Sequence, residues 1–253
     1  MLKQLCLFGL IAASSSLASD APASAARSPG SKYKNILIVG DSHTAQSYGI
    51  MLHGLFSSEG HKVATYGNCG SSPMGWFSKE SWASTKCGYF QGNFDHTGDR
   101  GNNKKTPYFP DLLKDMTAND EEMVVPDLVI IGLGANQINM LESEASFKAQ
   151  KATVTKMVAS VKEMGAKCYW IGPPDGDVKK KPIAKQDRLY SMLMQAMNES
   201  ENYCQFISSR QSAIPSMKYD CSTDGAHWDA CTSGRIRAVH WANHVFSRVS
   251  ENL

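Results

Sequence analysis

The feature that most constrains the fold is a series of five short strand-like runs, each followed by a turn. The runs cover residues 36–39, 62–66, 127–131, 168–171 and 204–207. Helical patterns lie between or after them, over residues 45–57, 146–164, 186–199 and 232–249. Strands that alternate with helices in this way predict a parallel sheet covered by helices on both faces.

The turns after the strands are where function is expected, because parallel α/β sheets bind ligands beyond the carboxyl ends of their strands. The residues of interest in these turns are Ser42, Gly70, Asn136, Pro173 and, late in the chain, His227.

Ser42 lies on the first turn, between the apolar run 36–39 and a helix expected from Thr44. A serine on a tight strand-to-helix turn presents its hydroxyl at the sheet edge, and the helix N-terminus favours developing negative charge. These properties suit a nucleophile. The alternative is that Asp41 and Ser42 only cap the helix and close the turn.

Acyl transfer by a serine also needs a base and a group that orients this base. His227 is the candidate base, and Asp224 three residues earlier can receive its imidazole N–H. Both residues precede the last predicted helix. The alternative is that they are surface loop residues, with Asp224 capping a turn.

The oxyanion needs hydrogen-bond donors. Gly70 offers a backbone N–H, Asn136 offers its side-chain amide, and the Ser42 backbone N–H is the third candidate. Gly70 and Asn136 are also common turn formers, and Gly67 competes with Gly70 for the role.

These motifs resemble, in order, the four sequence blocks of the SGNH/GDSL hydrolase superfamily. Residues 40–42 (GDS) resemble the first block, Gly70 the second, residues 134–136 (GAN) the third and residues 224–227 (DGAH) the last. The resemblance extends over nearly the whole chain after its N-terminal leader. It implies a flavodoxin-like three-layer α/β/α sandwich with about five parallel strands.

The same resemblance implies a serine esterase, lipase or acetylesterase that uses no metal and no other cofactor. By position, Ser42 would be the nucleophile, His227 the base and Asp224 its partner. The Ser42 amide, Gly70 and Asn136 would form the oxyanion hole.

Two positions depart from the usual blocks. His43 replaces the common leucine, a variant similar to that in carbohydrate-directed acetyl esterases and acyltransferases. Gln137 replaces an aspartate that often follows the asparagine of the third block, which puts a supporting hydrogen bond in doubt but not the donor itself.

The N-terminus is typical of an export signal, with Lys3 before an apolar run at residues 5–13 and small residues after it. We expect residues 1–26 to be signal peptide and lead-in, and residues 33–253 to form one SGNH-type hydrolase domain. The apolar run is too short to span a bilayer, and no second long run follows. We therefore expect an exported protein without a transmembrane segment, either periplasmic or extracellular.

The cysteines fit export. Cys6 lies in the leader, which leaves six others, an even number that favours disulfides over metal ligands. Proximity in sequence suggests Cys69–Cys87 and Cys221–Cys231, and the remainder gives Cys168–Cys204.

The substrate is expected to be an ester, with an O-acetylated glycan such as peptidoglycan as the leading hypothesis, because no apolar lid helix is evident. A net charge of only +2 gives no reason to expect nucleic acid as a partner. Three alternatives stay open: a lipid-directed esterase or lysophospholipase, an O-acetyltransferase using the same residues, and a non-enzymatic glycan-binding protein. The oligomeric state is left open.

Three further sets of residues allow two interpretations each. The aromatic residues of the long segment after the second strand line a substrate site or pack the loop onto the core. A run of lysines attracts an acidic polymer or is a solvated face. A histidine pair one helical turn apart lacks a third metal ligand, which favours a structural role. The sets are Trp76, Trp82, Tyr89, Phe90, Tyr108 and Phe109; Lys179, Lys180, Lys181 and Lys185; and His240 and His244.

Overall fold

The computed structural model describes residues 34–81, 87–94, 98–102, 104–117, 123–218, 220–221 and 225–253. Its strands are β1 (Asn35–Gly40), β2 (Lys62–Asn68), β3 (Tyr89–Gly92), β4 (Gly98–Gly101), β5 (Leu128–Gly132), β6 (Lys167–Ile171) and β7 (Cys204–Ile207). Its α-helices are α1 (Ser47–Ser58), α2 (Phe109–Lys114), α3 (Glu144–Met164), α4 (Ile183–Glu199) and α5 (Thr232–Ser250). Three short 3₁₀ helices are η1 (Gly75–Phe77), η2 (Ala135–Met140) and η3 (Trp228–Ala230).

The sheet has the order β4-β3-β2-β1-β5-β6-β7. The five strands β2, β1, β5, β6 and β7 are parallel, and β3 and β4 extend the sheet antiparallel beyond β2. The parallel part therefore has the order of a flavodoxin-like sheet. The predicted α/β fold with about five parallel strands is confirmed, with two antiparallel strands added.

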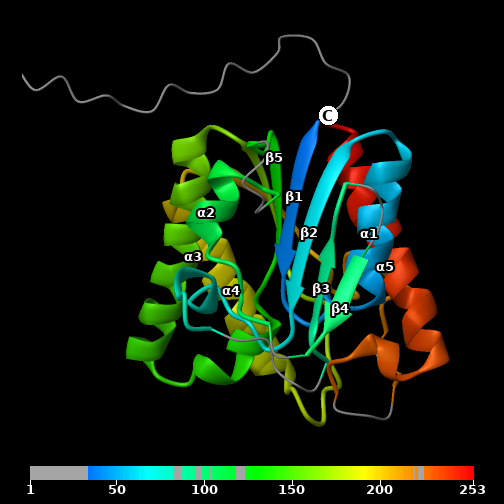
Figure 1. The fold of residues 1–253 in the computed structure, drawn as a ribbon. Coiled ribbons are helices and arrows are strands. Elements are labelled where there is room, and N and C mark those ends of the chain that lie inside the picture. Colours follow the sequence, from blue (N-terminus) through cyan, green and yellow to red (C-terminus); the bar gives the residue numbers. More distant parts are fainter. Residues whose placement is uncertain are drawn as a thin grey trace, which may run out of the picture. The chain divides into compact units, whose positions relative to one another are not determined.

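The helices cover both faces of the sheet, with α1 and α5 on one side and α2, α3 and α4 on the other (Figure 1). Alternation along β1 separates the two cores. Ile36 and Ile38 pack with α1 and α5, whereas Leu37 and Val39 pack with the other three helices. All four side chains are at most 1% exposed, as expected for a central strand buried on both faces.

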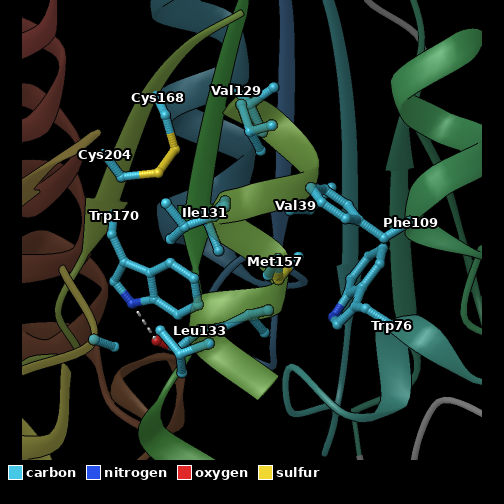
Figure 2. Packing of buried hydrophobic residues seen from close by; sticks show 14 of the residues in the cluster. Val39, Trp76, Phe109, Val129, Ile131, Leu133, Met157, Cys168, Trp170 and Cys204 are labelled. Atoms are coloured by element: carbon cyan, nitrogen blue, oxygen red, sulfur yellow. Dashed lines mark hydrogen bonds between the residues drawn. A yellow bond between two sulfur atoms is a disulfide. The ribbon is translucent and has the colours of Figure 1, made fainter. Parts of the chain in front are cut away.

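The core on the side of α3 and α4 is closed by Trp170, whose indole N–H donates to the Leu133 carbonyl at 3.1 Å (Figure 2). The disulfide between Cys168 and Cys204 lies in the same layer and joins β6 to β7. The hydrogen bond from Trp170 holds the chain just after β5, where the third sequence motif begins.

All three predicted disulfides are present: Cys69–Cys87, Cys168–Cys204 and Cys221–Cys231. Cys6 lies outside the described residues, as do the predicted signal peptide and Trp82. Among the helices that the structure describes, none is both long enough and apolar enough to cross a membrane.

The long segment after β2 contains the short helix α2 and also β3 and β4, which no strand-like run in the sequence indicates. These two strands have only four residues each, and all residues of β4 are exposed. Their pairing depends on the edge of β2 rather than on an apolar pattern of their own.

Candidate active site

The candidate site lies where β1, β2 and β5 end at the same level. Gly40 pairs with Gly67 of β2 on one side and with Gly132 of β5 on the other. Ser42, Gly70 and Asn136 each follow one of these strands within a few residues. The register therefore brings together the three segments that the sequence predicted to hold the nucleophile and the oxyanion donors.

The turn that carries Ser42 is buried and tightly held. Ser42 is 4% exposed and the adjacent Asp41 is 1% exposed. The Asp41 N–H donates to the Gly132 carbonyl at 3.2 Å, and the Ala45 N–H donates to the Asp41 carbonyl at 3.0 Å. The first bond ties the turn, which follows β1, to the end of β5, and the second closes the turn before α1 begins.

Two glycines allow this close packing. A Cβ on Gly40 would lie 1.9 Å from Thr44 Oγ1, and a Cβ on Gly67 would lie 2.3 Å from the backbone nitrogen of Ala45. Gly67 is thus a packing residue inside β2, whereas Gly70 lies beyond the strand, exposed and with φ of 80°. This arrangement favours Gly70 over Gly67 as the candidate donor.

Asn136 contacts the loop that carries Gly70. Its side-chain amide donates to the Ser71 carbonyl at 2.9 Å, and the Ser71 hydroxyl donates to the Gly40 carbonyl at 3.3 Å. Ser71 therefore connects all three segments. A side-chain NH₂ has two donors, so Asn136 can hold this loop and still present its second N–H to an oxyanion.

The Asp41 carboxylate lies beneath the turn. Its Oδ1 accepts from the His43 N–H at 3.0 Å, and the Ala135 backbone N–H also donates to this carboxylate. Burial raises the pKa of Asp41 to about 6, although these two bonds and the charges of Lys181 and His227 act in the opposite direction. Asp41 therefore supports the turn instead of only capping the helix.

His227 lies beside the turn. Its ring centroid is 6.1 Å from that of His43, and a ring nitrogen lies within 4.8 Å of both sulfurs of the Cys69–Cys87 disulfide. The candidate base thus lies next to both the turn of Ser42 and the loop that carries Gly70. Asp224, its predicted partner, lies outside the described residues.

The His227 loop is anchored to the helix that follows the nucleophile. Asp229 Oδ2 accepts from the Ser47 N–H at 2.9 Å and from the Ser47 hydroxyl at 2.7 Å. Asp229 and Ser71 belong to no motif that the sequence shows. Asp229 meets a partner 182 positions away, which no local pattern reveals, while Ser71 was detectable only as the neighbour of Gly70.

A small cavity opens beside these residues. His43, Ala135, Ala226 and Pro173, the last one of the predicted post-strand turn residues, line part of its wall. Its volume is about 20 Å³, roughly the space of one water molecule. The cavity reaches the chain neighbours of the candidate nucleophile and of the candidate base.

His43 and Gln137, the two residues that differ from the usual sequence blocks, have distinct structural roles. His43 is 6% exposed, lines the cavity and packs edge-on against Trp241, with ring centroids 5.4 Å apart. Gln137 is fully buried and donates from Nε2 to Gln150 of α3 at 2.9 Å. The hydrogen bond at Gln137 therefore supports η2 from the side of α3.

The aromatic set mainly packs the core. Trp76 and Phe109 are fully buried and Phe90 is 4% exposed, while Tyr89 and Tyr108 are half-buried. Trp76 also donates to the Ser71 hydroxyl at 3.2 Å, which helps to hold the Gly70 loop.

Two clusters of the described residues bring three potential metal ligands together: Cys69, Cys87 and His227, and Asp220, Cys221 and Cys231. Each cluster contains a disulfide, whose sulfurs are not thiolates and so do not bind a metal as thiolates do.

No family model matches the sequence, and no curated protein matches it either. Solved structures do match the fold. An acetyl xylan esterase named AlAXEase has a TM-score of 0.53 at 11% identity, over 85% of this chain and 99% of its own. The chain has the α/β fold of these esterase structures, which is the fold expected from its resemblance to the SGNH/GDSL hydrolases.

Two further esterases have similar structures. A catalytic mutant of the acetylxylan esterase Axe2 from Geobacillus stearothermophilus has a TM-score of 0.51 at 16% identity, over 84% of this chain and 94% of its own. The psychrotrophic esterase EstA from Pseudoalteromonas sp. has a TM-score of 0.52 at 14% identity, over 87% of this chain and all of its own. At these identities, the likeness between this chain and these three esterases is one of fold.

Proposed function

We propose that this protein is an exported serine esterase that removes short acyl groups, acetyl first, from a carbohydrate. The observation that carries the proposal is the meeting of the Ser42 turn, the Gly70 loop, Asn136 and His227 at one edge of the sheet. The acetyl xylan esterases with the same fold support the acyl group and the glycan.

The reaction begins with attack of the Ser42 hydroxyl oxygen on the ester carbonyl, while His227 takes the hydroxyl proton. The oxyanion is stabilised by the Ser42 and Gly70 backbone N–H groups and by the Asn136 amide. His227 then returns its proton to the departing alcohol, which leaves an acyl-Ser42 intermediate. Water, activated by His227, releases the acid and restores Ser42.

Asp224 completes this proposal as the acceptor that orients the His227 imidazole. It precedes the base by three residues, as the last block of the family has it, and no step beyond this orientation is assigned to it.

The size of the cavity supports a short acyl group. The cavity of about 20 Å³ is lined by His43 and Ala226, the chain neighbours of the candidate nucleophile and base, and it is far smaller than the pockets that enclose large ligands. The three disulfides support export, because such bonds persist in oxidising compartments.

The deciding experiment measures acetate release from O-acetylated xylan and peptidoglycan beside nitrophenyl esters of increasing chain length. We expect release by the wild type to fall about 10⁴-fold or more in Ser42→Ala, because the nucleophile is lost while the fold is kept. A fluorophosphonate should label the wild type and not the variant.

Full activity in Ser42→Ala would overturn the serine mechanism. Serine-dependent cleavage of long-chain esters alone would favour a lipid-directed esterase. Acetate transfer to an added sugar in preference to water would favour an O-acetyltransferase, and the absence of both labelling and turnover of any ester would leave a glycan-binding protein.

A further inference from the structure

One member of the lysine run differs from the others. Lys179 and Lys180 are exposed, and Lys185 pairs with Glu142 on the surface at 2.9 Å. Lys181 is half-buried and lines the cavity beside the candidate site, together with His43. The interpretation of the run as a solvated face thus holds for Lys179 and Lys180, whereas Lys185 is half-buried in its ion pair and Lys181 lines the cavity.

The backbone around Lys181 is held in place. Its N–H donates to the Asp177 carbonyl at 2.7 Å, and its carbonyl accepts from Gln186 Nε2 at 2.6 Å. Gln186 is 4% exposed, and its Oε1 also accepts from the Gly176 N–H at 3.0 Å. Both ends of this loop are therefore tied to the start of α4.

The direction of the Lys181 side chain is also restricted. A Cβ on Gly176 would lie 2.9 Å from Lys181 Cδ, so the aliphatic stem passes directly over this glycine. The loop in turn contacts the segment of the candidate base, since the Asp177 N–H donates to the Gly225 carbonyl at 3.0 Å. The Lys181 stem thus packs on Gly176, and the adjacent Asp177 binds Gly225, which lies two residues before His227.

The positive charge of Lys181 acts on the turn that carries Ser42: it lowers the pKa of the buried Asp41 carboxylate. The wall of the cavity also includes the apolar side chains of Ala135, Ile138 and Leu189. A largely apolar wall that includes Lys181 suits a small uncharged group on a molecule that carries an anion nearby.

We infer that Lys181 is a specificity residue that selects acetyl esters on an acidic glycan, by pairing with a sugar carboxylate close to the ester. The inference rests on the proposed esterase function. A carboxylate-bearing glycan is favoured over a phospholipid, because a cavity of about 20 Å³ is far smaller than a site that encloses a long acyl chain.

The test compares one glycan in two charge states: acetylated oligogalacturonate and the same material with its carboxylates methyl-esterified. We expect the wild type to show about fivefold higher kcat/KM for acetate release from the charged form, mainly through KM. Lys181→Gln should abolish this preference, and Lys181→Arg should keep it. Lys179→Gln, on the same loop but exposed, is the matched control and should behave as the wild type.

A calorimetric titration with oligogalacturonate that carries no acetyl group tests the inference without turnover. Wild type should bind it more tightly than Lys181→Gln, and salt should weaken the difference. If wild type releases no acetate from anything but binds in this Lys181-dependent way, the proposed function fails, while the pairing of Lys181 with a sugar carboxylate is supported. Equal affinities, or equal kcat/KM ratios in wild type and Lys181→Gln, would overturn it, as would Lys181-dependent cleavage of lysophospholipid alone.

Discussion

At the scale of single residues, the hydrogen bond from Asn136 to Ser71 holds both the Asn136 side chain and the loop of Gly70 in place. The Asn136 amide holds the Ser71 carbonyl, and Ser71 in turn holds the end of β1. The donor proposed for the oxyanion is therefore fixed by the loop that carries a second donor, Gly70. Such pre-arranged donors require no reorganisation when charge develops.

Replacing Asn136 by Ala should lower kcat for nitrophenyl acetate by about 10² to 10³-fold, because one oxyanion donor is lost. Steady-state kinetics would measure this change. Ser71→Ala is the matched variant: it removes the hydroxyl that donates to Gly40 but keeps the carbonyl that Asn136 contacts, so its effect should be smaller. Equal kcat values in Asn136→Ala and wild type would contradict the assignment of Asn136.

Asp41 should make stability depend on pH. Its folded pKa of about 6 lies above the value of 3.8 expected in the unfolded chain, so the folded state binds this proton more tightly. Protonation therefore favours folding, and the wild type should lose stability relative to Asp41→Asn as pH rises from about 4 to about 7. The expected difference is about 3 kcal/mol.

Urea unfolding of both proteins at several pH values would measure this effect. The amide introduced by Asp41→Asn still has an oxygen that can accept from the His43 N–H, so the variant isolates the charge. Parallel stability curves for the two proteins would show that Asp41 does not titrate in this range.

At the scale of elements, Asp229 connects the loop of the candidate base to the start of α1. Its carboxylate accepts two hydrogen bonds from Ser47, the first residue of this helix, where a negative charge is also favoured by the helix dipole. The side chain of the helix's own N-cap residue, Gln46, makes no capping bond. The helix behind the nucleophile is thus capped from the C-terminal part of the chain.

Asp229→Ala should destabilise the protein by about 1–2 kcal/mol, as expected when a helix cap is lost. It should also lower kcat, because the loop that carries His227 loses its anchor. Ser47→Ala removes only the hydroxyl donor and should cost less on both counts. Urea unfolding and nitrophenyl acetate kinetics would measure these changes, and a fully stable, fully active Asp229→Ala would refute the role of this contact.

At the scale of the whole molecule, the parallel sheet ends in a pair of strands joined by a disulfide. Cys168 and Cys204 are register partners in β6 and β7, 36 residues apart in sequence. A bond that closes a loop of this length restricts the unfolded chain, by about 4 kcal/mol in the chain-entropy model.

The double variant Cys168→Ala/Cys204→Ala should therefore unfold at a lower denaturant concentration than wild type, by a free energy of up to about 4 kcal/mol. Its catalytic constants should change little, because the disulfide lies in the core away from the candidate site. Unchanged stability in the double variant would show that this cross-link contributes nothing beyond the packing of β6 on β7.

Much of this fold follows from local signals. The five parallel strands are predicted because apolar runs end in turn residues, and Gly165 ends α3 in the left-handed conformation that favours glycine. β3 and β4 could not be predicted, since two strands of four residues, one of them wholly exposed, carry no period of their own.

By itself, the sequence determined the alternation of strands and helices and the order of the motifs after the strands, since these depend on residues near one another. It suggested the three disulfide pairs, because the chain after its leader has few cysteines and two of the pairs are close in sequence. Only the tertiary structure decided that Ser71 joins three segments, that Asp229 caps a helix 182 residues earlier, and that Lys181 alone of its run lines the cavity. These contacts depend on strand register and helix packing, which bring distant residues together and leave no trace in local sequence.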